Sequence, residues 1–193
     1  MTQVEQRPGR RASWLVGISG VLAATAVVVV GFVWWQHDWG EPFPALDSER
    51  LDEQQIALVQ VLRREYEQPG DGPKYAEGVR EAWCADFVSW TMREAGRPLA
   101  NPNSGSWRIP GVYTLQEYYQ QVGRFTPADV GYRPRTGDVV LYGPNSPLGQ
   151  HTNIVLTADG DSITTIGGNE MGSVRVRTIV PAETADLVGY GRF

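Results

Sequence analysis

Residues 81–96 contain the only cysteine of the chain, Cys84, in a segment whose apolar spacing favours a helix. The apolar or small residues that recur at three-and-four spacing are Cys84, Phe87, Val88, Thr91 and Ala95. That spacing is the pattern of one helix face. Gly96 is a natural stop, and Arg93 suits the negative end of the helix dipole. The pattern therefore predicts a helix with Cys84 in its first turn, on the buried side.

This position leaves two interpretations of the thiol open. A lone cysteine on a helix face is usually a small core residue. However, only the thiolate is a good nucleophile, and a helix N-terminus and a neighbouring imidazolium both favour it. An unpaired cysteine in an exported chain suggests a reactive thiol or an intermolecular pair.

A second feature, an uncharged run, indicates export. From Trp14 to Trp35 there is no charged residue, and a helix of that length spans roughly 30 Å, the thickness of a bilayer's hydrocarbon core. The basic residues that precede it are Arg7, Arg10 and Arg11. By the positive-inside tendency, the N-terminus stays cytoplasmic and the rest lies outside. A cleaved secretory signal is the alternative, but the run is long and no small-x-small cleavage site follows it.

We therefore expect a cytoplasmic tail over residues 1–13, a transmembrane helix over 14–35, a linker over 36–47 and a catalytic domain over 48–193. The expected location is the cell membrane, in a single pass, with the domain outside the cytoplasm. The formal net charge of −5, with basic residues scattered, argues against nucleic acid as a partner. The oligomeric state stays open.

Within the domain, helical patterns come first and strand patterns second. We expect a helix from about Ser48 to Gln68 and, after an irregular loop over 97–113, a short helix opened by a capping box at Thr114–Glu117. Segments rich in Val, Ile and Thr then predict strands at 138–142, 151–157, 162–166, 174–180 and 187–190. Gly160 lies in a hairpin-type turn. This order indicates an α+β domain with an antiparallel sheet of about four to six strands.

A thiol needs an imidazole partner to act at neutral pH. The chain has two histidines, and His37 abuts the predicted membrane helix, so His151 is the candidate. A third polar group must orient the ring. Asn169 is the first choice, just after the third predicted strand, and Glu170 and Asn153 are weaker competitors. His151 could instead be a satisfied strand histidine, and Asn169 could be a turn asparagine, which is common after Gly-Gly.

Four blocks together resemble the CHAP family, the cysteine, histidine-dependent amidohydrolases/peptidases. The blocks are Trp83–Trp90 with Glu94–Gly96, then Gly137–Tyr142, His151–Val155 and Thr165–Asn169. The resemblance implies a papain-like fold, with Cys84 as nucleophile, His151 as general base and acid, and Asn169 as the orienting residue. Some members carry a Glu two positions before that Asn, where this chain has Gly167.

The resemblance also bears on metals and cofactors. Some phage members bind calcium before the cysteine through closely spaced aspartates, but this chain has Glu77, Glu81 and Asp86 with no Asp-x-Asp pair. Catalytic zinc usually needs three protein ligands, and one plausible histidine is available. We therefore expect no metal and no cofactor.

The function that the resemblance implies is hydrolysis of an amide bond in peptidoglycan, in the stem peptide or crosslink, through a Cys84 thioester. We expect Trp83, Trp107 and Tyr113 to contact substrate, although the aromatic residues of the 97–113 loop could instead fold back into the core. The alternative is a catalytically degenerate CHAP-like scaffold or regulator of a cell-wall complex. A third possibility is an amidase or acyltransferase acting on another exported substrate.

Overall fold

The computed structural model of the protein describes residues 40–193. The predicted cytoplasmic tail, the predicted membrane span over 14–35 and the first residues of the predicted linker lie outside the described residues. Among the helices of residues 40–193, none has the length and apolar character needed to cross a membrane.

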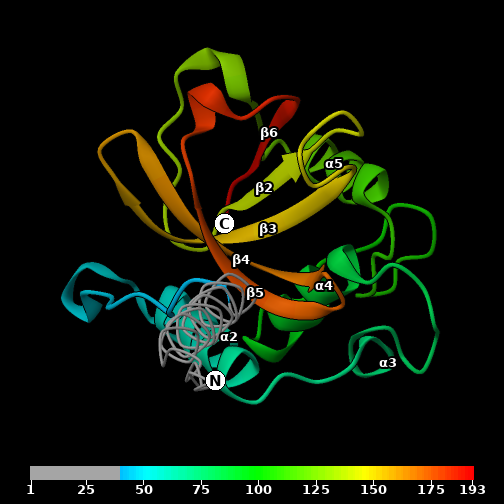
Figure 1. Ribbon diagram of the computed structural model, residues 1–193. Helices are drawn as coiled ribbons and strands as arrows, with labels where there is room; N and C mark the ends of the chain where they lie inside the picture. Colours follow the sequence, from blue (N-terminus) through cyan, green and yellow to red (C-terminus); the bar gives the residue numbers. More distant parts are fainter. Residues whose placement is uncertain (1–39) are drawn as a thin grey trace, which may run out of the picture. The chain divides into compact units, whose positions relative to one another are not determined.

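Helices precede most of the strands, as the sequence predicts (Figure 1). The helices are α2 (Glu53–Glu67), α3 (Gly72–Tyr75), α4 (Cys84–Glu94) and α5 (Val112–Gln121), with short 3₁₀ turns η1 (Ser48–Arg50), η2 (Ala128–Val130) and η3 (Pro181–Glu183). The strands are β1 (Phe125–Pro127), β2 (Val139–Tyr142), β3 (His151–Asp159), β4 (Ser162–Glu170), β5 (Ser173–Ile179) and β6 (Leu187–Gly191). They form one six-stranded antiparallel sheet in the order β1-β6-β2-β3-β4-β5. The α+β class and the antiparallel sheet are confirmed.

The first long helix begins later than the sequence pattern predicts. Asp52 caps α2 by accepting a hydrogen bond from the backbone of Gln55, whose side chain accepts one in return from the backbone of Asp52. This capping box fixes the start of the helix at Glu53. The face of α2 that carries Leu58 and Leu62 is fully buried.

The main core lies between the helices and the sheet. Figure 1 shows α4 beside β3 and β4, and both strands contact the helix. Phe87 and Val88 of α4 share one apolar cluster with Ile154 of β3 and Ile166 of β4. A smaller cluster gathers Val140, Tyr142, Val155, Ile163 and Tyr190. Because α4 is packed along its length, its first residue has a fixed position relative to the sheet.

Two local predictions meet different outcomes. The hairpin turn after β3 is confirmed, because Asp159 pairs with Ser162 across a two-residue loop in which Gly160 has a φ of 57°. The capping box at Thr114 is wrong. The last described helix, α5, begins at Val112, with Gly111 as its N-cap residue and no side-chain cap.

Part of the predicted linker contacts the domain. The backbone N–H of Glu41 donates to the carbonyl of Val176, and its carboxylate accepts from the backbone N–H of Thr178 at 2.8 Å. Phe43 packs against Tyr66 of α2, with ring centroids 5.6 Å apart. The described chain therefore lies along β5 before it enters α2.

Candidate active site

Cys84 is the first residue of α4, and its side chain is not in a disulfide. It is 6% exposed, at the N-terminal end of the helix, where the residue before it supplies no side-chain cap. The first backbone N–H groups of a helix have no partner within the helix and carry a partial positive charge. The sulfur therefore lies beside backbone donors that can hold a negative oxygen.

Gly168 allows α4 to approach β4 closely. A Cβ atom at this position would lie 2.5 Å from the Cβ of Phe87 and 2.5 Å from the ring of Trp83, a separation that real Cβ atoms do not adopt. Any larger residue at 168 would push the N-terminal turn of α4 away from the strand. The glycine thus fixes the distance between the thiol and the sheet.

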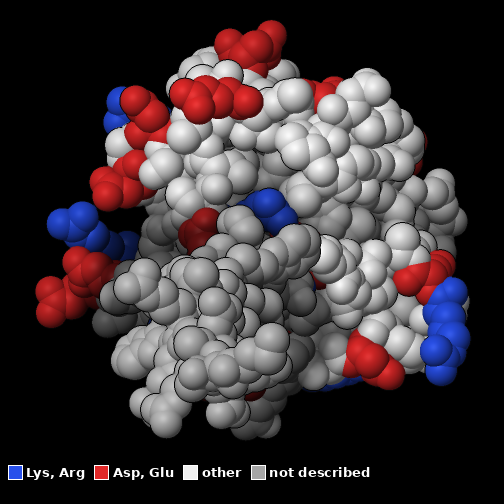
Figure 2. Space-filling view, in the orientation of Figure 1, with Lys and Arg blue, Asp and Glu red and all other residues white. Residues whose placement is uncertain are grey.

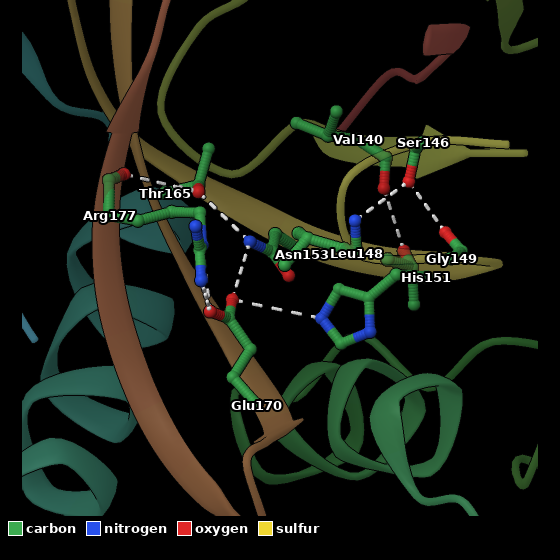
Figure 3. A network of polar contacts seen from close by, with 10 residues as sticks. Val140, Ser146, Leu148, Gly149, His151, Asn153, Thr165, Glu170 and Arg177 are labelled. Atoms are coloured by element: carbon green, nitrogen blue, oxygen red, sulfur yellow. Dashed lines mark hydrogen bonds and ion pairs between the residues drawn. The ribbon is translucent and has the colours of Figure 1, made fainter. Parts of the chain in front are cut away.

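His151 is the first residue of β3 and is paired with Tyr142 of β2. The residue is 6% exposed, and its ring has two polar neighbours, the thiol of Cys84 and the carboxylate of Glu170. The Nε2 atom lies 3.7 Å from Oε1 of Glu170, which is an ion-pair contact rather than a short hydrogen bond. Figure 3 shows Nε2 turned toward Glu170 and the other ring nitrogen facing away from it.

The charge state of the His151 ring follows from these contacts. Burial lowers the pKa of an imidazole, but the neighbouring Cys84 thiol and Glu170 carboxylate outweigh burial and raise the pKa of His151 to about 9. The folded domain therefore favours a protonated ring at neutral pH.

Glu170 is held by a network of its own, drawn in Figure 3. Its Oε1 accepts from the side-chain amide of Asn153 at 3.0 Å, and its Oε2 accepts from Nε of Arg177 at 2.7 Å. Asn153 in turn donates to Thr165, whose hydroxyl donates to the backbone of Arg177. Burial raises the pKa of Glu170, but His151 and Arg177 outweigh burial, so the net pKa is lowered and the carboxylate stays charged.

The acid at the imidazole is thus Glu170, where the sequence favoured Asn169. Strand β4 continues past the predicted end at Ile166, and its pairing with β5 shifts register between Gly167 and Glu170. Asn169 lies in this irregular stretch with a φ of 62°, and no hydrogen bond within the described part of the chain joins it to His151. The shift presents the next side chain, Glu170, to the ring.

The three aromatic residues predicted to contact substrate lie in different environments. Trp83 is 6% exposed and stacks on Tyr75 with ring centroids 5.0 Å apart, so it packs in the core. Trp107 is partly buried against the core and lies 4.0 Å below the guanidinium of Arg93. Tyr113, in the first turn of α5, is 60% exposed and remains available for contact.

Charged groups at the site do not form a metal cluster. Across residues 40–193, no three or more His, Cys, Asp or Glu side chains are placed to hold an ion. Asp86 and Glu81, which border Cys84 in the sequence, are instead bonded to Arg108. On the face in Figure 2, acidic and basic side chains are interspersed, and the basic ones form no stripe.

Comparison with known families adds an independent observation. The CHAP domain family model matches residues 74–169, a stretch that runs from α3 into β4 and includes both Cys84 and His151. Residues 74–169 belong to the CHAP domain family. The match ends one residue before Glu170, so the group that contacts the imidazole lies just beyond the matched segment of this CHAP domain.

Solved structures similar to this CHAP domain include two of Ly7917. The structure described as Ly7917 with the hydrolyzing product of MDP is 19% identical, with a TM-score of 0.43, and the match covers 70% of this chain and 61% of that one. A second structure of Ly7917 is 16% identical, with a TM-score of 0.46 and coverages of 70% and 60%. The match thus spans about three fifths of the length of each of these two Ly7917 chains. No curated protein matches the sequence.

Proposed function

We propose that this protein is a cysteine amidohydrolase that cleaves an amide bond in peptidoglycan, with a papain-like arrangement of its CHAP domain. The observation that carries the proposal is that the His151 ring has both the thiol of Cys84 and the carboxylate of Glu170 as polar neighbours, with Nε2 3.7 Å from the carboxylate. A histidine between a sulfur nucleophile and an orienting acid is the arrangement that nucleophilic catalysis needs. The solved Ly7917 structure with the hydrolyzing product of MDP, although distant, is in keeping with this substrate class.

In the proposed mechanism, the sulfur of Cys84 attacks the scissile carbonyl and the C–N bond breaks. His151 gives its proton to the leaving amine, which leaves a thioester on the sulfur. The neutral ring then takes a proton from water, and the resulting hydroxide releases the acid and restores the thiol. The backbone N–H of Cys84, at the start of α4, helps to hold the oxyanion.

Glu170 is a positioning residue in this scheme. Its contact at Nε2 leaves the opposite ring nitrogen for the sulfur and stabilises the imidazolium. Arg177 and Asn153 keep the carboxylate in place and charged. We further propose that residues 14–35 anchor the chain in the cell membrane with the domain outside, so that anchoring supplies proximity to the wall.

Digestion of purified peptidoglycan tests the proposal. The full chain, the Cys84→Ala variant and the His151→Gln variant are incubated with the same substrate, and released muropeptides are identified by mass spectrometry. His37→Gln serves as the matched control, because it removes the only other histidine. We expect new amide-derived termini from the wild type and the control alone. Equal product from the Cys84→Ala protein would refute the proposal.

One observation favours a second candidate, a non-enzymatic scaffold of a cell-wall complex. The sulfur of Cys84 belongs to a residue that is only 6% exposed, which suits a core cysteine as well as a shielded nucleophile. A folded Cys84→Ala protein that fully complements a deletion in cells would support the scaffold. Loss of complementation with normal folding, judged by thermal unfolding, would exclude it.

A further inference from the structure

A pocket of about 460 Å³ lies at the end of α4 that is farthest from Cys84. Met92 of α4, Tyr118 of α5 and the guanidinium-bearing residues Arg97, Arg124 and Arg192 line it. Helix α4 rises about 1.5 Å per residue, so its last turn lies about 15 Å from the thiol. The pocket is therefore separate from the proposed catalytic centre.

Three guanidinium groups line this pocket without an ion-pair partner among the described side chains. No acidic side chain lines it, and within residues 40–193 none of the three arginines forms an ion pair. Some arginines of the domain do so, namely Arg50, Arg64, Arg93, Arg108 and Arg177, whereas others on the surface, such as Arg133, form no ion pair within the described residues. In a chain with a formal net charge of −5, the gathering of three guanidinium groups without an ion pair around one pocket favours an anionic partner.

The existing contacts hold two of these side chains in place and leave donors free. Arg97 donates to the amide oxygen of Gln54 and lies 4.3 Å over the ring of Phe193. Arg192 donates through Nη2 to the carbonyl of Gly123 at 2.6 Å. The side chain of Arg124 makes no hydrogen bond or ion pair within the described residues. An arginine has five N–H donors, so each of the three can still bind an oxygen.

We propose that this pocket binds a small polyanion, a molecule with two or more carboxylate or phosphate groups next to a short apolar part. Guanidinium groups match both anions with paired hydrogen bonds. The volume lies in the range of small-molecule sites, and Met92 and Leu99 supply an apolar wall. The activity proposed above does not require this site.

Isothermal titration calorimetry on the full chain at low salt tests the proposal with two probes, citrate for carboxylates and pyrophosphate for phosphates. The Arg124→Gln variant removes the unengaged guanidinium, and Arg133→Gln is the matched control, because Arg133 is exposed and does not line the pocket. We expect saturable binding of at least one probe. Loss of one charged hydrogen-bonding group should weaken it about tenfold or more in Arg124→Gln, with no change in the control.

The probe that binds identifies the ligand class. Binding of citrate alone indicates a carboxylate ligand, and binding of pyrophosphate alone indicates a phosphate ligand. Binding of both probes indicates a site that selects for negative charge. The absence of saturable binding up to about 10 mM of either probe, equivalent to only about 3 kcal/mol, would overturn the proposal. Equal affinities of Arg124→Gln and Arg133→Gln would overturn it as well. Cys84→Ala should bind as the wild type does, so a failed titration leaves the proposed hydrolase activity untouched.

Discussion

Replacing Glu170 by glutamine tests the electrostatics of the site. The change removes the negative charge that lies 3.7 Å from Nε2 of His151 and keeps the size of the side chain. The amide oxygen of the new residue can still accept from Asn153 or from Arg177, but the amide nitrogen can accept from neither. The perturbation is therefore mainly a loss of charge beside a buried ring.

The size of the effect follows from the pKa of His151. Its value of about 9, against an ordinary 6.5, corresponds to about 3 kcal/mol of preferential stabilisation of the charged ring. Cys84 and Glu170 together supply this stabilisation against the opposing effect of burial. Removal of the Glu170 charge should lower the pKa of His151 by at least about one pH unit, toward or below 6.5. The rate of amide hydrolysis should fall by about 10²-fold.

An NMR titration of the histidine rings measures this directly. The chain has two histidines, so His37→Gln assigns both resonances. Glu183→Gln is the control, since Glu183 is an exposed carboxylate in η3. A midpoint that stays near pH 9 in Glu170→Gln would refute the assignment of Glu170 as the acid that stabilises the imidazolium.

Two further predictions concern α4. Gly168→Ala places a Cβ 2.5 Å from that of Phe87 and should lower the free energy of unfolding, measured in urea, by about 1–3 kcal/mol. In the control Gly111→Ala, the new Cβ has no neighbour nearer than 3.4 Å, so the loss should be no more than about 1 kcal/mol. Equal losses in the two variants would contradict the close approach of α4 to β4 at Gly168. Burial raises the pKa of Asp86 to about 6 despite Arg108, so the folded state binds a proton more readily than the unfolded chain. Relative to Asp86→Asn, wild-type stability should therefore fall by about 2 kcal/mol as the pH rises from 4 to 7, and a rise would contradict it.

The parts of the site that could be predicted from the sequence depend on local pattern. Three-and-four spacing places Cys84 at the start of α4, and the observed helix begins there. Alternating Val, Ile and Thr residues predict β3, and His151 is its first residue. The three-residue strand β1 was missed, because it is too short for a periodic signal and ends in Pro127, which is typical of a turn or an edge.

Glu170 could not be chosen over Asn169 from the sequence, because its orientation depends on register. In a regular strand, neighbouring side chains alternate between faces, so a shift by one residue exchanges the side chains that face a given neighbour. The irregular pairing of β4 with β5 produces such a shift, and it depends on contacts between distant segments. At the register shift, the backbone of Asn169 adopts a positive φ, and asparagine is among the residues that tolerate such a conformation.

The two glycines before Asn169 explain how the acid can come from residue 170. A Cβ at Gly167 would lie 2.1 Å from Oδ1 of Asn153 and 2.9 Å from Oε1 of Glu170. A glutamate at 167 would therefore displace the groups that now hold the carboxylate. A Cβ at Gly168 would displace α4 on its other side, together with the thiol at its start. Gly167, at the position where some family members carry an acid, thus leaves the room that the Glu170 carboxylate occupies. This favours the interpretation that the acid at the imidazole comes from residue 170 instead of residue 167.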